Sequence, residues 1–243
     1  MKIFTDHTLQ FQQVFDGAYR YLDHCGEFMD TVRKELNFMH LGVNPSGCDM
    51  ESSDSSIRLQ ASIDNIVLTA SEPDGPKQLV KTADFCCSAA RRIFQPFSVE
   101  YNRLTLSTHI RTATLEESFR LSLEYLPGVP QDMSKALDLS PYNQDLNFVF
   151  QSGSHRIQVH LYPAAINLPM QERRLPVLGY PKTHGKHLLR REKKLEQAPQ
   201  QPFYVLNLEI SVIENDPVED SSVQAIYEKV YEYKKRVLKA FER

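Results

Sequence analysis

The chain has 243 residues, which is enough for one large domain or two small ones, each with a hydrophobic core. Its 41% hydrophobic and 24% charged residues exclude wholesale disorder, and only nine glycines disfavour a fold built on several glycine-rich phosphate loops. The formal net charge of −3 provides no global attraction to nucleic acid or to an anionic membrane.

The four cysteines contain no Cys-x-x-Cys pair, and this spacing disfavours a zinc site. No stretch approaches the roughly 18 consecutive apolar residues of a transmembrane helix. The N-terminus also lacks the continuous apolar run of a signal peptide. We therefore predict a cytoplasmic protein with free thiols, no membrane partner, and no metal or other cofactor.

The first long pattern predicts one amphipathic helix over residues 11–36, because apolar residues recur at alternating spacings of four and three. Two interpretations remain open: the helix packs on the protein's own sheet, or it forms part of an oligomer seam. The residues of the candidate oligomer seam are Phe15, Leu22, Met29 and Leu36.

The middle of the first half alternates between strand and loop patterns. Residues 38–43 form a short strand candidate, and the polar stretch 46–56 is typical of a loop. Alternating apolar residues predict a pair of strands at 57–63 and 66–70, and an apolar face predicts a helix over residues 79–93.

Two capping boxes mark helix starts in the second half, one at Thr114 with Glu117 and one at Ser221 with Gln224. Alternating apolar residues favour strands elsewhere in this half, with one irregularity in the stretch 99–110. The predicted elements are a strand at 99–110, a helix at 114–125, a helical turn at 133–139, a hairpin of 146–150 with 157–161, a strand at 203–212, and a helix at 223–240.

Together these elements predict a single α+β domain over residues 1–243, in which antiparallel strands pack against amphipathic helices. Paired strands followed by a helix occur twice, so a pseudo-duplication into halves 1–112 and 113–243 is an open interpretation. A long, basic, proline-containing insert is predicted at 163–202, since this stretch is too long for an ordinary connection.

No common catalytic or nucleotide-binding motif occurs, and no catalytic residue is assigned. His155 and His160 lie on one predicted strand at a separation that points them to opposite faces. His109, close to Arg111 on another predicted strand, is the strongest candidate for an enzyme of unrecognised class.

The predicted insert carries a basic cluster, with eight Lys or Arg residues against three Glu over residues 172–196. Such a cluster suits salt-dependent binding of nucleic acid, docking on an acidic partner, or a solvated loop. The candidate nucleic-acid-binding or partner-binding residues are Arg173, Arg174, Lys182, Lys186, Arg190, Arg191, Lys193 and Lys194.

The order of elements over residues 55–243 resembles a sporadically distributed, functionally uncharacterised family of bacterial proteins. The stretches that carry the resemblance are 63–69, 103–112, 115–121, 125–130, 206–212 and 225–241. The resemblance implies a strand, a short acidic helix, a Pro-x-x-Pro turn, a hairpin, an apolar strand and a C-terminal helix. It also implies an accessory component of bacterial defence or of mobile loci, and it implies no activity.

Three functional hypotheses follow from these patterns. The first is a non-catalytic cytoplasmic interaction protein, acting as a homo-oligomer or as a subunit of a larger bacterial complex. The second is a nucleic-acid-binding protein that uses the basic segment 173–194. The third is an enzyme of unrecognised class.

Overall fold

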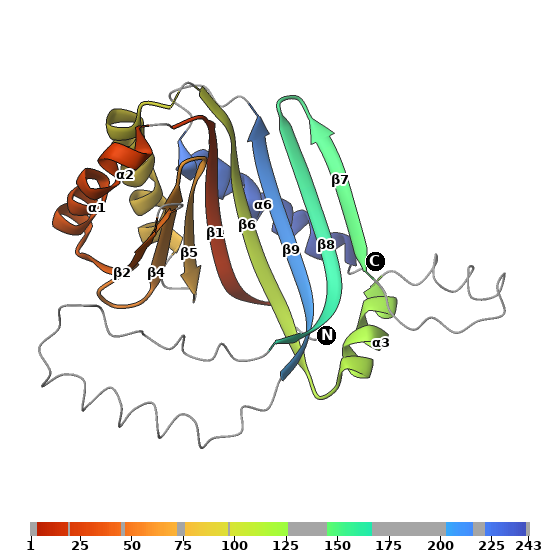
Figure 1. Cartoon of the computed structure of the whole chain (residues 1–243). Coiled ribbons are helices and arrows are strands. Elements are labelled where there is room, and N and C mark those ends of the chain that lie inside the picture. Colours follow the sequence, from red (N-terminus) through yellow and green to blue (C-terminus); the bar gives the residue numbers. More distant parts are fainter. Residues whose placement is uncertain are drawn as a thin grey trace, which may run out of the picture.

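The computed structural model describes residues 4–18, 20–44, 47–71, 76–96, 98–125, 145–166, 203–215 and 222–241. These residues form one nine-stranded antiparallel sheet and four helices (Figure 1). The strands are β1 (Thr5–Asp16), β2 (Phe38–Asn44), β3 (Gly47–Ser52), β4 (Ile57–Ser62), β5 (Asn65–Ser71), β6 (Ser98–Thr112), β7 (Leu146–Ser152), β8 (His155–Ile166) and β9 (Phe203–Asn215). The helices are α1 (Tyr21–Leu36), α2 (Pro76–Phe94), α3 (Leu115–Tyr125) and α6 (Val223–Phe241).

The central strands β1 and β6 are antiparallel neighbours, with Phe11 opposite Leu104. From β1 the sheet continues through β5, β4 and β3 to β2, and from β6 it continues through β9 and β8 to β7. Among the described strands, the two edges of the sheet are therefore β2 and β7. The predicted α+β class is confirmed.

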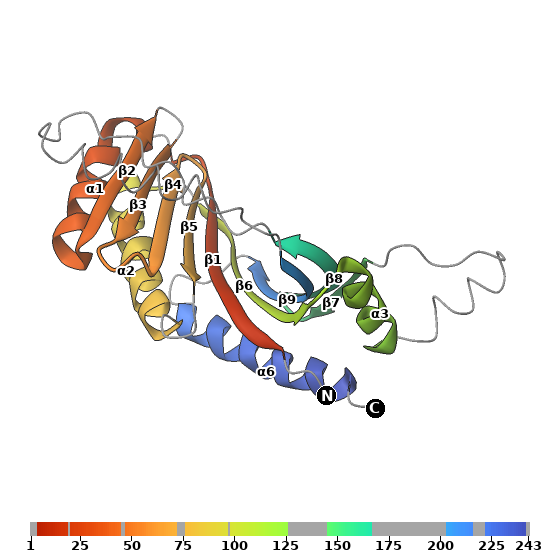
Figure 2. The ribbon, with the colours of Figure 1, turned by 90° about the horizontal axis from the view of Figure 1, so that it is seen from below.

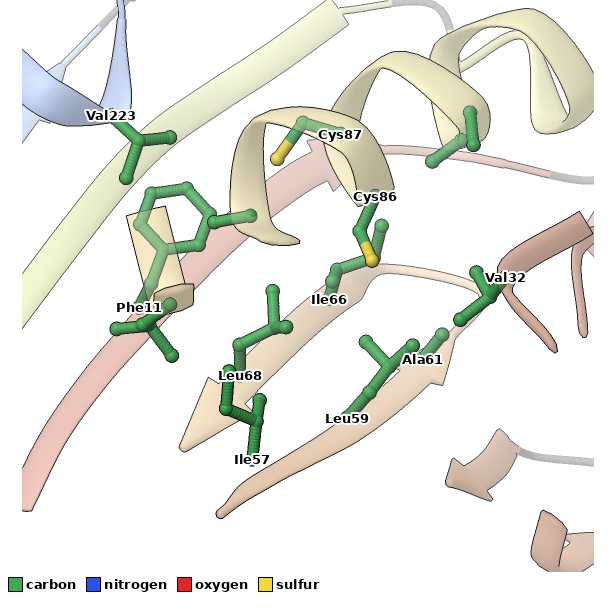
Figure 3. Close-up of a cluster of buried hydrophobic side chains, with 14 of the residues drawn as sticks. Phe11, Val32, Ile57, Leu59, Ala61, Ile66, Leu68, Cys86, Cys87 and Val223 are labelled. Atoms are coloured by element: carbon green, nitrogen blue, oxygen red, sulfur yellow. The ribbon is translucent and has the colours of Figure 1, made fainter. Parts of the chain in front are cut away.

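Three helices cover one face of the sheet (Figure 2). α1 packs beside β2 and β3, α2 against β5 and β1, and α6 against β6 and β9. Every second residue of a strand points to that face, so Ile57, Leu59 and Ala61 of β4 are all buried. Figure 3 shows these side chains clustered with Cys86 and Cys87 of α2, which form part of the same hydrophobic core.

The predicted helix over residues 11–36 is wrong in its first part, because residues 5–16 form the strand β1. Its buried residues alternate at Leu9, Phe11, Gln13 and Phe15. The alternation is hidden in the sequence because a buried position carries Gln13, whose side chain donates a 3.0 Å hydrogen bond to the buried Asn102. The alternating spacing of four and three therefore runs across a strand and a helix by chance, and it does not mark a single helix.

The polar stretch 46–56, predicted as a loop, is also partly wrong. Residues 47–52 form β3, in which Cys48 and Met50 point into the core. The turn follows at Asp54, whose carboxylate accepts hydrogen bonds from Ser52 (2.6 Å) and Ser56 (2.8 Å). The short polar side chains therefore build a turn and not a long loop.

The remaining described elements match the predictions closely. Thr114 caps α3 as predicted, since its hydroxyl accepts a 3.1 Å hydrogen bond from the Glu117 amide, while the Glu117 carboxylate accepts one from the Ala113 amide at 2.7 Å. At α6 the cap is Ser222, which accepts a 3.2 Å hydrogen bond from the Ala225 amide, while Ser221 lies outside the described residues. The predicted start of the insert at residue 163 is wrong, because residues 163–166 belong to β8. The predicted turn at 133–139 and the rest of the insert lie outside the described residues.

Candidate interaction surface

β7 forms one edge of the sheet and pairs on its inner side with β8. The hairpin turns through two residues, and the first of them, Gly153, has a φ of 60°. Glycine adopts this left-handed conformation at no steric cost, and two-residue hairpin turns require it. The register runs without a shift from Ser152, opposite His155, to Leu146, opposite Leu161.

Three consecutive large hydrophobic side chains are exposed on β7. The exposed fractions are 42% for Phe148, 63% for Val149 and 54% for Phe150. Phe148 and Phe150 point to the face that α6 partly covers. Val149 points to the opposite face, which we call the open face because α1, α2 and α6 lie on the other side of the sheet (Figure 2). None of the seven residues of β7 is charged. We call residues 148–150, together with the outer edge of β7, the β7 surface.

A hollow of about 150 Å³ lies between β7, β8 and the last turn of α6. Its lining is entirely apolar. The main contributors are Phe148 and Phe150 of β7, Val159 and Leu161 of β8, and Val237 and Phe241 of α6.

The last turn of α6 is held toward α3 by aromatic contacts. The Phe241 ring lies 5.2 Å from the ring of Tyr125, which in turn lies 5.6 Å from the ring of Phe4. Because α6 packs over β6 and β9, it reaches β7 only across the hollow. This placement explains why the two phenylalanines of β7 stay half exposed.

The opposite edge of the sheet is less regular than β7. The pairing of β2 with β3 shifts register between His40 and Gly42, and Asn37, just before β2, has a φ of 55°. A register shift twists an edge strand and interrupts its row of backbone groups, which hinders pairing with another chain. β7 carries no such shift, no proline and no charge. It is therefore the edge better suited to regular strand pairing.

On the open face, a polar network joins β8 and β9 to the start of β7. His160 lies 2.5 Å from Asp145, the residue directly before β7. Three hydroxyl or amide groups of β6, β8 and β9 donate to the Glu209 carboxylate at 2.8–3.2 Å: those of Ser107, Tyr162 and Asn207.

The electrostatics of this network favour a structural role. Burial and the neighbouring Glu209 carboxylate raise the pKa of Tyr162 to about 12, so Tyr162 remains a hydrogen-bond donor at neutral pH. The hydroxyl of Tyr162 also accepts a 2.7 Å hydrogen bond from Asn207. These groups satisfy one another, and they hold the three strands next to the edge in a fixed register.

The histidines considered in the sequence occupy separate places. His155 lies 3.3 Å from Glu214 and contacts Lys229 of α6, so it points to the helical face, while His160 points to the open face as predicted. His109 is buried, with its ring 4.8 Å from that of His7, and Arg111 is exposed.

Burial, together with the charges of His7 and Arg111, lowers the pKa of His109. The buried imidazole is therefore neutral at physiological pH, which suits a structural residue of the sheet. Within the described ranges, no group of three or more His, Cys, Asp or Glu side chains is arranged to hold a metal ion.

The four candidate seam residues do not form one stripe. Phe15 of β1 and Met29 of α1 are buried in the protein's own core, and Leu36 packs against it. Leu22 is 61% exposed. The basic residues 173–194 lie outside the described residues, so their role stays a prediction.

The β7 surface was not singled out from the sequence, although the hairpin was. The signal is present in residues 147–151, where three large apolar residues stand in a row without a charge. A half-buried strand normally carries polar residues on one face, so such a row indicates a strand with two apolar faces.

No protein-family model matches this chain, and the search of curated proteins gives no significant match. None of the helices in the described part of the chain is long and apolar enough to cross a membrane.

Proposed function

We propose that this is a non-catalytic cytoplasmic protein that acts by assembling with protein through its β7 surface, as a homo-oligomer or as a subunit of a larger complex. The observation that carries the proposal is the run of three exposed hydrophobic residues on an uncharged, regular edge strand. Natural proteins usually protect a sheet edge with a charge, a proline or a bulge.

The energetics also support assembly at this edge. Burial of apolar surface stabilises a contact by about 25 cal/mol per Å², and Phe148 and Phe150 offer aromatic area beside an apolar hollow. The backbone groups on the outer edge of β7, which pair with no strand among the described residues, gain hydrogen bonds in the same contact. One partner strand thus satisfies both the side chains and the backbone of β7.

The order of elements supports a duplicated architecture with diverged edges. A long central strand, a helix, further strands and a second helix occur from β1 to α2 and again, among the described elements, from β6 to α6. This division falls before β6, whereas the halves expected from the sequence are 1–112 and 113–243. The edges β2 and β7 each follow the first helix of their half. In this proposal only the β7 edge has kept the properties of an interface. A setting among accessory components of bacterial defence or mobile loci rests on the resemblance alone.

Native mass spectrometry of the protein purified from its own host at low salt tests the proposal. We expect an assembled mass for the wild type that is lost in Val149→Lys and kept in Met39→Lys. Met39 is the matched control because it is a hydrophobic residue of the other edge strand and is 41% exposed. A bare monomer for the wild type would overturn the proposal. An added polynucleotide mass would favour nucleic-acid binding by residues 173–194 in its place.

A further inference from the structure

We propose that the partner at the β7 surface is a second copy of this chain, with the two β7 strands paired antiparallel about a two-fold axis at Val149. This inference rests on the proposed function, because it names the partner of the same surface. In the resulting dimer the two sheets continue into one another.

The sequence of β7 reads almost the same in both directions about Val149. Phe148 and Phe150 flank it, and beyond them Asn147 and Gln151 carry the same amide group. About a two-fold axis at Val149, Phe148 faces Phe150 of the second copy, and Asn147 faces Gln151 of the second copy. The central facing pairs therefore match in chemistry, as a self-complementary interface requires.

The hairpin geometry places the axis on a residue whose backbone points outward. The residues that flank a two-residue hairpin turn form a hydrogen-bonded pair, and such pairs alternate along the ladder. Ser152 and His155 are that pair, so Phe148 and Phe150 bond to β8. The N–H and C=O groups of residues 147, 149 and 151 are then directed to the outer edge. An axis at either phenylalanine would bring together groups that already bond to β8.

The side chains favour the same pairing. Phe148 and Phe150 already stack within one chain, with ring centroids 6.3 Å apart. In the paired strands, the two rings of each copy form one row of four rings. This row lies on the face of the sheet that carries the hollow of each copy. Aromatic pairs across neighbouring strands stabilise a sheet. No like charges face each other, because β7 contains no charged residue.

Cysteine cross-linking of the full-length chain tests this register. The background is Cys25→Ser, which removes the one native thiol that is not fully buried. In that background, Val149→Cys places two α-carbons about 5.5 Å apart across the axis, which suits a disulfide. We expect a covalent dimer on oxidation with copper phenanthroline.

Gln151→Cys in the same background is the matched control, since it lies on the same face of the same strand. Its two copies are offset by about 13 Å along the paired strands, so it does not cross-link alone. Asn147→Cys also does not cross-link alone, but a mixture of the Asn147→Cys and Gln151→Cys chains gives a covalent heterodimer.

The outcomes separate this inference from the proposed function. A dimer from Gln151→Cys alone would overturn the register. If purified Val149→Cys gives no covalent dimer while the assembly from the host still depends on Val149, self-pairing is overturned and the proposed function stands. If Val149→Cys stays monomeric and resists alkylation by maleimide, the chain itself covers β7, and both are overturned.

Discussion

The rings of Phe148 and Phe150 stack with their centroids 6.3 Å apart and their planes 22° apart, and both rings are about half exposed. They are neighbours on one face of an edge strand, beside an apolar hollow that α6 does not fill. Two stacked aromatic rings in water at a sheet edge are a surface suited to a partner. The self-pairing proposed above assigns each ring a counterpart on the second copy.

The first prediction concerns these two rings. Phe148→Thr and Phe150→Thr should each make the free energy of dimerisation less favourable. The change in the double variant should be smaller than the sum of the two single changes. The reason is that Phe148 of one copy faces Phe150 of the other, so either substitution removes one member of the same pair.

Sedimentation equilibrium of the wild type, the single variants and the double variant checks this prediction. Met39→Thr on the other edge strand is the control, and it should leave the association unchanged. Strictly additive effects of the two phenylalanine substitutions would argue against the facing arrangement.

A second prediction tests the assignment of β1 as a strand. Gln13→Ala should lower the free energy of unfolding by about 1–3 kcal/mol, because it leaves the buried Asn102 without its hydrogen-bond partner. Gln10→Ala is the matched control, since Gln10 is exposed on the same strand, and its effect should stay below about 0.5 kcal/mol. Urea denaturation measures both values. Equal effects at the two positions would contradict the alternation of β1.

A third prediction concerns thiol reactivity. Cys48, Cys86 and Cys87 are buried in the core, and Cys25 is partly exposed. Burial raises the pKa of Cys48 to about 11 and that of Cys87 to about 12, which suppresses the reactive thiolate. With a thiol reagent at neutral pH, one thiol should react in the folded protein and all four after unfolding in guanidinium. Rapid labelling of Cys86 or Cys87 in the folded protein would contradict the packing of α2 on the sheet.

A fourth prediction follows from the same groups at high pH. Burial also raises the pKa of Tyr162 to about 12. The buried thiols and this phenol therefore keep protons that the unfolded chain releases near the ordinary pKa values of 9.0 for a thiol and 10.0 for a phenol. Because the unfolded chain then binds fewer protons, the free energy of unfolding falls as the pH rises. The slope reaches about 1.4 kcal/mol per pH unit for each such group.

Urea titrations between neutral pH and about pH 11 measure this dependence. The free energy of unfolding should stay constant up to about pH 9 and should decline at higher pH. A Cys48→Ala variant loses one of the contributing groups, so its decline should be shallower. A stability that is flat through pH 11 would show that these groups are not buried in the folded protein.

Much of the fold could be predicted because its signals are local. In the β7–β8 hairpin a two-residue turn at Gly153 precedes the alternating apolar residues Ile157, Val159 and Leu161, and α3 begins with the cap at Thr114. β1 could not be predicted, because a buried hydrogen bond allows Gln13 to occupy a core position and so breaks the apolar alternation. β3 was missed because Asp49 and Glu51 on its open face give it the composition of a loop.

The candidate site depends on tertiary contacts that no local sequence pattern predicts. Whether β7 is an edge or an inner strand is decided by the pairing of β8 with β9 and of β9 with β6. The exposure of Phe148 and Phe150 depends on the path of the last turn of α6, where Phe241 lies against Tyr125 and a hollow separates the helix from β7. Both are contacts between residues distant in the chain, so a local pattern in residues 146–152 cannot report them.

Sedimentation velocity over a range of concentrations, for the wild type, Val149→Lys and Met39→Lys, tests the central claim most directly. The wild type and Met39→Lys should move from 28.0 kDa toward twice that mass as the concentration rises. Val149→Lys should need at least about tenfold more protein to dimerise, a loss of about 1.4 kcal/mol or more, because two like charges then face each other across the axis. A wild type that stays at 28.0 kDa, or a Val149→Lys variant that dimerises as readily as the wild type, would contradict the account.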